Sequence, residues 1–264
     1  MSESVETILA AALRGGLDAD FEALAHSCAD DVEFRSAITA TAVGPAAVTA
    51  ELRRLQVSGR FVKAVEWEVE ASEREAQVIA RLPIESFYDR FEWDLALNDA
   101  GKIVRITQTG VAQTQPLPPS RIHLTDDFVK ALDWARESRN PVIVAYVDAS
   151  VQPRQSPRGT LQVLSPTQLA FWNHSPRGGL IDAIALNPKL SVHYWGGIGT
   201  LYGGAVSFQG TATITQDPSL RTLIYERSPA SEQRSDPQRL GCAVVIELTQ
   251  VSGFMSGLRY NMVG

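Results

Sequence analysis

The chain has few of the residues that build disulfide frameworks or metal sites. It has only two cysteines, Cys28 and Cys242, which lie far apart and show no metal-ligand spacing. Its four histidines are also scattered, without the paired spacing that is typical of zinc ligands. We therefore expect two buried free thiols and no metal site.

Long apolar runs and concentrated positive charge are also missing. No stretch approaches the roughly 20 apolar residues that a membrane helix needs, and residues 1–30 lack a basic flank followed by an apolar core. Residues 1–115 carry 11 Lys or Arg against 19 Asp or Glu, whereas residues 116–264 carry 13 against 11. Nucleic-acid binding requires a concentrated basic face. We expect a cytoplasmic protein that binds neither a membrane nor nucleic acid.

The sequence divides near its middle. The 264 residues, of which 44% are apolar and 20% charged, suffice for two domains of roughly 100–150 residues. Three prolines within four residues, Pro116, Pro118 and Pro119, favour extended chain and exclude regular structure. We predict a first domain over residues 1–112, a linker over 113–123 and a second domain over 124–264.

The first domain has the pattern of an α+β unit. Helices are predicted over Ser4–Leu13, over Asp18–Ala25 with Asp18 as cap, and from Gly44-Pro45 to about Leu55. Alternation of polar and apolar residues predicts strands over 30–34, 65–69, 77–82, 91–95 and 102–107. Three helices beside a run of antiparallel strands make an α+β fold.

The first domain resembles the nuclear transport factor 2-like, or SnoaL-like, family. The residues that carry the resemblance are Asp30-Asp31-Val32-Glu33-Phe34, the Gly44-Pro45 helix start and Asp99-Ala100-Gly101-Lys102-Ile103. The resemblance implies a cone in which a curved antiparallel sheet wraps three helices around a pocket. Some members of that family are isomerases or cyclases, and many have no catalysis.

Candidate pocket groups in this cone are charged residues of the strands and their connections: Glu85, Asp89, Arg90, Glu92 and Asp94. Strand alternation places the charged side chains of residues 90–94 opposite Phe91, Trp93 and Leu95, so a solvated face is the simpler interpretation. Because no His or Tyr stands among them, a general acid–base site is not supported.

In the second domain, the local patterns predict mainly strands. A helix is expected from Leu124 to about Arg139 with Thr125 as cap, followed by a strand over Val142–Val147. Ser165-Pro166-Thr167 joins two strand-like runs into a hairpin. Next come a helix over residues 179–186, a strand over 190–195, a helix over 220–227, a polar segment over 228–239 and a closing strand over 243–248.

The tetrapeptide Ser-Pro-Arg-Gly occurs twice, at Ser156–Gly159 and at Ser175–Gly178, each time at the edge of a strand-like run. Arg presents a fork that suits a phosphate, and Gly lets the backbone come close to a ligand. The pattern therefore favours a small anionic ligand. The alternative is that both copies are solvent-facing turns.

At these residues the chain resembles the FMN-binding split-barrel family, the pyridoxamine 5'-phosphate oxidase-like proteins and their deazaflavin-using relatives. The resemblance extends from about Leu124 to about Phe254. The residues that carry it are Ser156–Thr160, Leu169–Ser175, Asn187–Val192, and Val206–Ala212 followed by Asp217-Pro218. It implies a mainly β split barrel, FMN or a deazaflavin coenzyme as cofactor, and a homodimer with the cofactor at the interface.

The resemblance also implies a set of cofactor-binding residues: Arg158, Gly159, Thr160, Trp172, Asn173, His174, Ser175, Arg177 and Lys189. The chain departs from the family where a Ser-x-Lys phosphate contact is replaced by Gly178-Gly179-Leu180, so Arg177 would have to substitute. A deazaflavin, with its long anionic tail, could use Arg154 or Lys189. His174 is the candidate proton donor, or else a hydrogen-bonding neighbour.

Together these observations predict a flavin- or deazaflavin-dependent oxidoreductase that passes a hydride to or from a small organic substrate. The glycine-rich hairpin around Tyr202, from Trp195 to Gly204, would cover the ring or form a mobile loop. Two alternatives stay open. One is a flavin-binding protein without turnover, and the other is an isomerase or cyclase that uses the first domain.

Overall fold

The computed structural model describes residues 4–15, 21–37, 39–57, 64–197 and 202–264. The described residues form two compact units. The first unit consists mainly of the chain up to Leu117, with Ser256–Arg259, and the second consists of Pro118–Gly197, Gly204–Met255 and Tyr260–Gly264. The change from one unit to the other at Leu117 falls inside the predicted linker.

The first unit contains three helices, α1 (Val5–Arg14), α2 (Phe21–Ser27) and α3 (Pro45–Val57). In α1 the buried residues Leu9, Ala10, Ala12 and Leu13 follow helical spacing, which gives the helix one apolar face. The third helix starts with a proline at its first position, where no N–H is needed. Asp18, the predicted cap of α2, lies outside the described residues.

Six strands form the sheet of the first unit, in the order β2-β1-β6-β5-β4-β3. Their bounds are β1 (Cys28–Ser36), β2 (Ala42–Val43), β3 (Glu66–Ala71), β4 (Glu75–Arg81), β5 (Tyr88–Leu97) and β6 (Ile103–Ala112). The sequence predicts a sheet that is antiparallel throughout. This prediction is wrong, because β1 pairs with β6 in parallel. A parallel pair needs a long connection, and α3 with β3–β5 supplies it.

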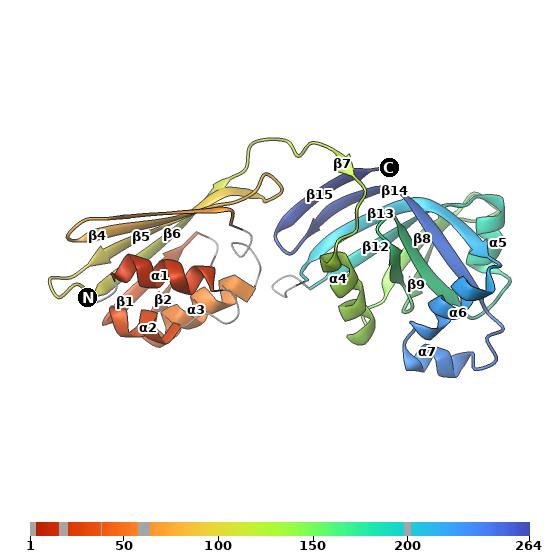
Figure 1. Ribbon diagram of the computed structural model, residues 1–264, viewed down its shortest axis with the longest axis horizontal. Helices are drawn as coiled ribbons and strands as arrows, with labels where there is room; N and C mark the ends of the chain where they lie inside the picture. Colours follow the sequence, from red (N-terminus) through yellow and green to blue (C-terminus); the bar gives the residue numbers. More distant parts are fainter. Residues whose placement is uncertain (1–3, 16–20, 38, 58–63, 198–201) are drawn as a thin grey trace. The chain divides into compact units, whose positions relative to one another are not determined.

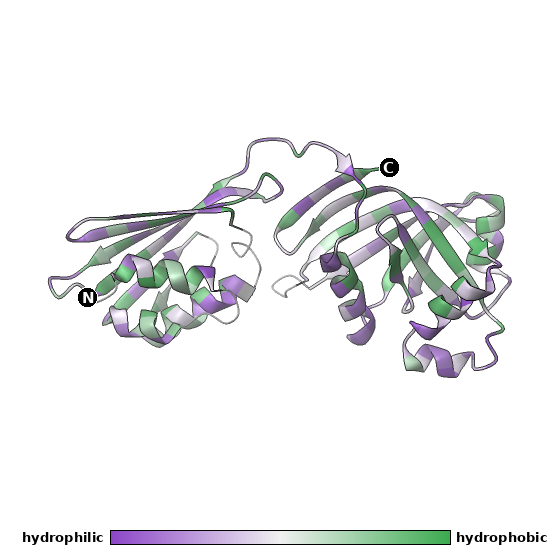
Figure 2. Cartoon of the chain, in the orientation of Figure 1, coloured by the Kyte–Doolittle hydropathy of each residue, from purple (hydrophilic) through white to green (hydrophobic). Residues whose placement is uncertain are grey.

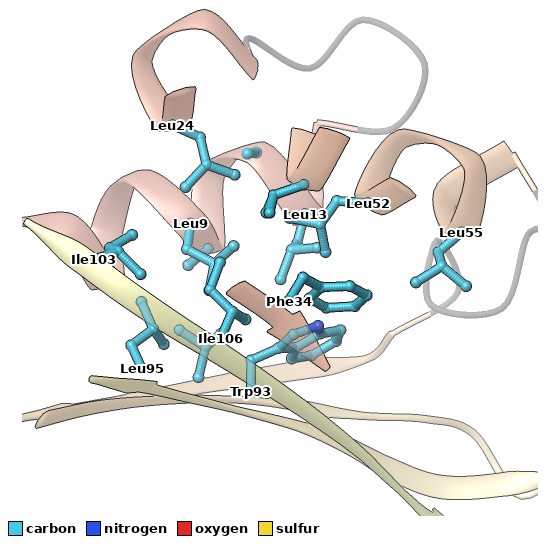
Figure 3. Close-up of a cluster of buried hydrophobic side chains, with 14 of the residues drawn as sticks. Leu9, Leu13, Leu24, Phe34, Leu52, Leu55, Trp93, Leu95, Ile103 and Ile106 are labelled. Atoms are coloured by element: carbon cyan, nitrogen blue, oxygen red, sulfur yellow. The ribbon is translucent and has the colours of Figure 1, made fainter. Parts of the chain in front are cut away.

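The three helices cover one face of this sheet, as Figure 1 shows. Leu9 and Leu13 of α1 meet Leu52 of α3 and the strand residues Phe34 and Trp93, and all five are fully or almost fully buried (Figure 3). This apolar layer fills the space between helices and sheet. Whether the unit belongs to the SnoaL-like family stays a prediction.

The other face of the sheet is polar, as the alternation predicts. Along β5, Phe91 and Trp93 are buried, whereas Asp94 is exposed (Figure 2 shows the alternation along the strands). Arg90 contacts Glu92 at 2.6 Å and Asp89 at 3.1 Å. Three of the candidate pocket groups, Asp89, Arg90 and Glu92, are therefore paired with one another, and a fourth, Glu85, is exposed.

The second unit is mainly β, as predicted. Its strands follow the path β10-β11-β14-β13-β12-β8-β9, and β15 pairs with β14 and, in parallel, with β7. The bounds are β7 (Ser120–Arg121), β8 (Val142–Val147), β9 (Pro153–Arg158), β10 (Gln162–Ser165), β11 (Gln168–Asn173), β12 (Lys189–Gly196), β13 (Gly204–Thr215), β14 (Cys242–Met255) and β15 (Leu258–Val263). In Figure 1 these strands curl around a common interior.

Four helices border this sheet: α4 (Asp126–Glu137), α5 (Gly179–Leu186), α6 (Pro218–Glu226) and α7 (Ala230–Ser235). Asp217 caps α6, accepting hydrogen bonds from the backbone N–H groups of Ser219 and Leu220. Thr125 precedes α4 as predicted but makes no side-chain cap bond. No helix in the part of the chain described is long and apolar enough to cross a membrane.

Both cysteines are free and buried. Burial raises the pKa of Cys28 to about 11, and it also raises the pKa of Cys242. A raised thiol pKa lowers the fraction of reactive thiolate at neutral pH. The two thiols therefore act as small apolar side chains of the two cores.

Candidate functional site

A cavity of about 620 Å³ in the second unit brings together most of the predicted cofactor-binding residues. It lies where the ends of β9 and β11 meet the C-terminal turn of α4 and the segment around α7. The predicted residues that line it are Arg158, Gly159, Thr160, Trp172, Asn173, His174 and Ser175. Residues that the sequence placed in one site thus share one cavity.

Thr160 joins the two strand ends. Its hydroxyl donates to the carbonyl oxygen of Trp172 at 2.8 Å and accepts from the backbone N–H of the same residue at 3.2 Å. The side chain is almost fully buried. The hydroxyl thus donates to one backbone group of Trp172 and accepts from another, so Thr160 holds the two strand ends together at the cavity wall.

Arg158 is a half-buried cation at the cavity wall. Its guanidinium donates one hydrogen bond, to the carbonyl oxygen of Pro157 at 2.9 Å, and lies 5.5 Å from the ring centre of Phe171. Its Nε is buried and has no hydrogen-bond partner among the described residues. Burial lowers the pKa of Arg158, against the opposing effects of nearby groups such as Glu232. A partly desolvated cation with no ion pair in the described parts of the chain favours an anionic ligand.

The residues after β11 shape a turn instead of presenting free polar groups. Asn173 donates to the carbonyl oxygen of Ser175 at 2.6 Å, and the Ser175 hydroxyl donates to the carbonyl oxygen of Arg177 at 2.7 Å. Arg177 and Lys189 are exposed and lie outside the cavity, at the start of α5 and of β12. Their predicted roles in cofactor binding stay predictions.

Sequence reasoning missed the residues that two helices contribute to the cavity. Arg136 and Arg139 come from the end of α4, and Ser231 and Glu232 come from the segment of α7. Arg136 donates to the carbonyl oxygen of Arg227 at 2.7 Å, which ties the two walls together. Arg139 lies 19 positions before Arg158, and Ser231 lies 56 positions after Ser175, so no local spacing links these residues to the predicted ones.

One of the missed residues pairs with a predicted one. Glu232 Oε2 lies 3.0 Å from His174 Nε2. The other carboxylate oxygen sits above Gly159, where an added Cβ would lie 3.4 Å from it. A Cβ at this position would make ordinary van der Waals contact with the carboxylate, so Glu232 packs directly against the backbone of Gly159.

Asp236 holds the wall behind Trp172. Its carboxylate accepts from the indole N–H of Trp172 at 3.0 Å and from the backbone N–H groups of Gly241 and Leu240, each at 2.9 Å. Burial by itself raises the pKa of Asp236, but the three hydrogen bonds outweigh it and the pKa lies below its usual range. The ionised carboxylate thus fixes the segment between α7 and β14 against β11.

The variant Asp236→Asn is expected to lower the free energy of unfolding by about 2 kcal/mol at pH 7, because an amide cannot accept all three bonds. A depressed pKa in the folded state stabilises the protein above the pKa of the unfolded state, and this contribution is lost as the pH falls through the folded pKa. The difference between wild type and variant should therefore shrink in acid. Urea unfolding at pH 7 and near pH 3 checks both points, with the exposed Asp182→Asn as control; a difference that is the same at both pH values would contradict this account.

A second hollow, of about 510 Å³, lies on the polar sheet face of the first unit and is lined by residues such as Gln77, Asp94 and Thr107. Gln77 donates to Asp94 at 2.7 Å, so these groups already satisfy each other. Within the described residues, no cluster of His, Cys, Asp and Glu has the arrangement that holds a metal ion.

No protein-family model matches the chain, and no curated protein does. Solved structures are similar to about half of it. Group A Streptococcus HupZ matches with a TM-score of 0.38 and 19% identity over 52% of this chain and 98% of its own. A putative pyridoxamine 5'-phosphate oxidase from Lactobacillus delbrueckii matches with a TM-score of 0.36 and 19% identity, over 49% of this chain and 93% of its own. An FMN-binding protein from Syntrophomonas wolfei matches with a TM-score of 0.37 and 11% identity, over 47% of this chain and 86% of its own.

These identities and TM-scores are low, and they assign this chain no function. The functional proposal therefore has to depend on the cavity of the second unit and on the side chains that line it.

Proposed function

We propose that the second unit binds a phosphate-bearing redox cofactor, FMN or a deazaflavin coenzyme, and acts with it as an oxidoreductase on a small organic substrate. The observation that carries the proposal is Arg158, a cation at the wall of a 620 Å³ cavity whose Nε is buried without a partner among the described residues. FMN is named because the residues around Arg158 resemble those of the split-barrel family.

The residues of the cavity fit such a ligand. Arg158 is the anchor for the phosphate, since a guanidinium binds phosphate oxygens through two parallel hydrogen bonds. Trp172, Pro157 and Pro141 give the cavity apolar wall, which a flavin ring needs. Arg139, exposed at the end of α4, adds a second positive charge at the rim.

When bound, the cofactor supplies hydride transfer at its central ring, and the protein supplies binding, orientation and exclusion of water. Arg158 binds the anionic end, and Thr160 and Asp236 hold the strand ends at fixed positions. His174, exposed at the rim and paired with Glu232, remains the candidate for a group that gives or takes a proton.

The first experiment is an absorbance spectrum of the purified protein, followed by titration with FMN and with a deazaflavin. We expect a bound chromophore or saturable binding of one of the two cofactors. Binding without reduction of any tested substrate would favour the alternative of a flavin-binding protein without turnover. No binding of either cofactor would remove the proposal.

The other alternative, an isomerase or cyclase in the first unit, has no support from the charged residues considered for it. Arg90 pairs with Glu92 and Asp89, and Asp94 accepts from Gln77. Groups that are already hydrogen-bonded on an open sheet face are poor candidates for acid–base chemistry.

The homodimer with cofactor at the interface also stays a prediction. On β12, residues Lys189, His193 and Trp195 share the outward face, and the Trp195 side chain is half exposed. A tryptophan on an open sheet face is typical of interaction surfaces. If a second copy packs there, Lys189 would lie close to the interface, where the split-barrel resemblance expects it.

A further inference from the structure

A carboxylate lies at the wall of the same cavity as Arg158. Glu232 lines the cavity, pairs with His174 at 3.0 Å and has one oxygen above Gly159. Its charge acts on Arg158, where it raises the pKa against the larger effect of burial. A carboxylate beside a cation that binds anions weakens the binding of those anions. Its presence at this wall therefore indicates another role.

The position of Glu232 is built into the fold. The Tyr225 hydroxyl contacts the carbonyl oxygens of Gln233 and Asp236, each at 3.0 Å. The side chain of Gln233 donates to the carbonyl oxygen of Ser228 at 2.8 Å. The segment that carries Glu232 is thus fixed at both ends, and the carboxylate is held at the cavity instead of moving freely in solvent.

Two opposite charges at one cavity favour a ligand that satisfies both. A bare anion gains from Arg158 but is repelled by Glu232. A ligand that also carries an N–H or O–H donor gives the carboxylate a charge-assisted hydrogen bond in return. Specificity of this kind arises because a charged group repels the wrong ligand and forms a hydrogen bond with the right one.

We infer that Glu232 is a specificity-determining residue, which selects ligands that combine an anionic group with a neighbouring N–H or O–H donor and disfavours bare anions. The inference deepens the proposed function and rests on it where the ligand is a flavin. FMN has both features, with its phosphate and its ring and ribityl donors, whereas sulfate has only the charge.

The test compares the binding of FMN and of sulfate by wild type, Glu232→Gln and Glu232→Ala. The glutamine variant removes the charge and keeps an acceptor, so we expect sulfate to bind about fivefold more tightly and FMN not to gain. The alanine variant removes the acceptor too, and we expect FMN to bind about tenfold more weakly. FMN is followed by fluorescence quenching, and sulfate by the shift in unfolding midpoint.

Two controls isolate the effect. Glu226→Gln removes the same charge at an exposed position, where the carboxylate pairs with Arg239 instead of lining the cavity. Arg158→Ala measures how much sulfate stabilises the protein without binding to Arg158. Neither FMN nor sulfate affinity should change in the first control.

If Glu232→Gln increased the affinity for FMN and for sulfate equally, the inference would be overturned, because Glu232 would then only repel anions. Unchanged sulfate binding would overturn it as well, since the carboxylate would not act on the anion. If wild type binds no flavin but sulfate tightens in Glu232→Gln, the proposed cofactor fails while the effect of Glu232 on anions stands.

Discussion

Replacement of Arg158 by alanine is expected to raise the Kd for FMN about 100-fold, the largest functional effect of any single substitution considered. A hydrogen-bonded ion pair with a phosphate, in a site partly shielded from water, contributes roughly 2–3 kcal/mol. In Arg158 that contact would use a guanidinium with an unsatisfied Nε. Fluorescence quenching of FMN on titration with protein measures the change.

The matched control is Arg154→Ala. Arg154 lies on β9 with Arg158 and is exposed, but its guanidinium already pairs with Asp148 at 2.7 Å. FMN affinity should stay within about twofold of wild type, since the remaining effect is long-range and screened by salt. A deazaflavin with a long anionic tail should be more sensitive to this change. Equal losses of FMN affinity in both variants would mean that overall charge, and not the Arg158 site, governs binding.

A large loss of stability is expected for Gly241→Ala, beside the cavity wall. An added Cβ would lie 2.2 Å from the carbonyl oxygen of Asn173, 2.8 Å from Trp172 Nε1 and 2.9 Å from Asp236 Oδ2. The Asn173 carbonyl lies on one side of the added Cβ, and the hydrogen bond between Trp172 and Asp236 lies on the other, so the Cβ does not fit. We expect the free energy of unfolding to fall by about 3 kcal/mol or more. Urea unfolding followed by circular dichroism measures it.

Gly101→Ala separates this clash from ordinary backbone strain. Gly101 has a φ of +73°, which disfavours other residues, but nothing lies within 4 Å of an added Cβ. The expected loss is about 1 kcal/mol. If Gly241→Ala costs no more than Gly101→Ala, the segment after α7 can move away from β11 and the cavity wall is softer than its hydrogen bonds indicate.

Where local residues determine an element, the sequence was sufficient. Helix α5 and strand β8 have the predicted bounds, because Asn187-Pro188 ends the helix and a run of β-branched residues fills the strand. The motif around Arg158 and Trp172 also pointed to residues that line one cavity. In these places the signal lies within a few neighbouring positions.

The sequence could not predict contacts between segments that are far apart along the chain. Glu232 lies 58 positions after His174, in a segment predicted only to be polar, and it turned out to contain α7. The parallel pairing of β1 with β6 is likewise a matter of topology and leaves no mark on either strand. Strand β15 was missed because Ser256 and Gly257 end the preceding pattern close to the C-terminus.

The two copies of Ser-Pro-Arg-Gly have the same sequence but different structures, because their neighbouring segments differ. Residues 156–158 of the first copy are part of β9, whereas the second copy, Ser175–Gly178, forms an exposed turn before α5. Neighbouring β8 offers the first copy a strand to pair with. Only the first arginine therefore faces the cavity.

Strand β9 carries a consequence for how the protein meets other chains. It is the last strand of its sheet and contains Pro153 and Pro157. Proline has no N–H to donate, so an incoming strand would find gaps where it needs hydrogen bonds. The margin beside Arg158 thus resists growth into fibrils and domain-swapped ladders.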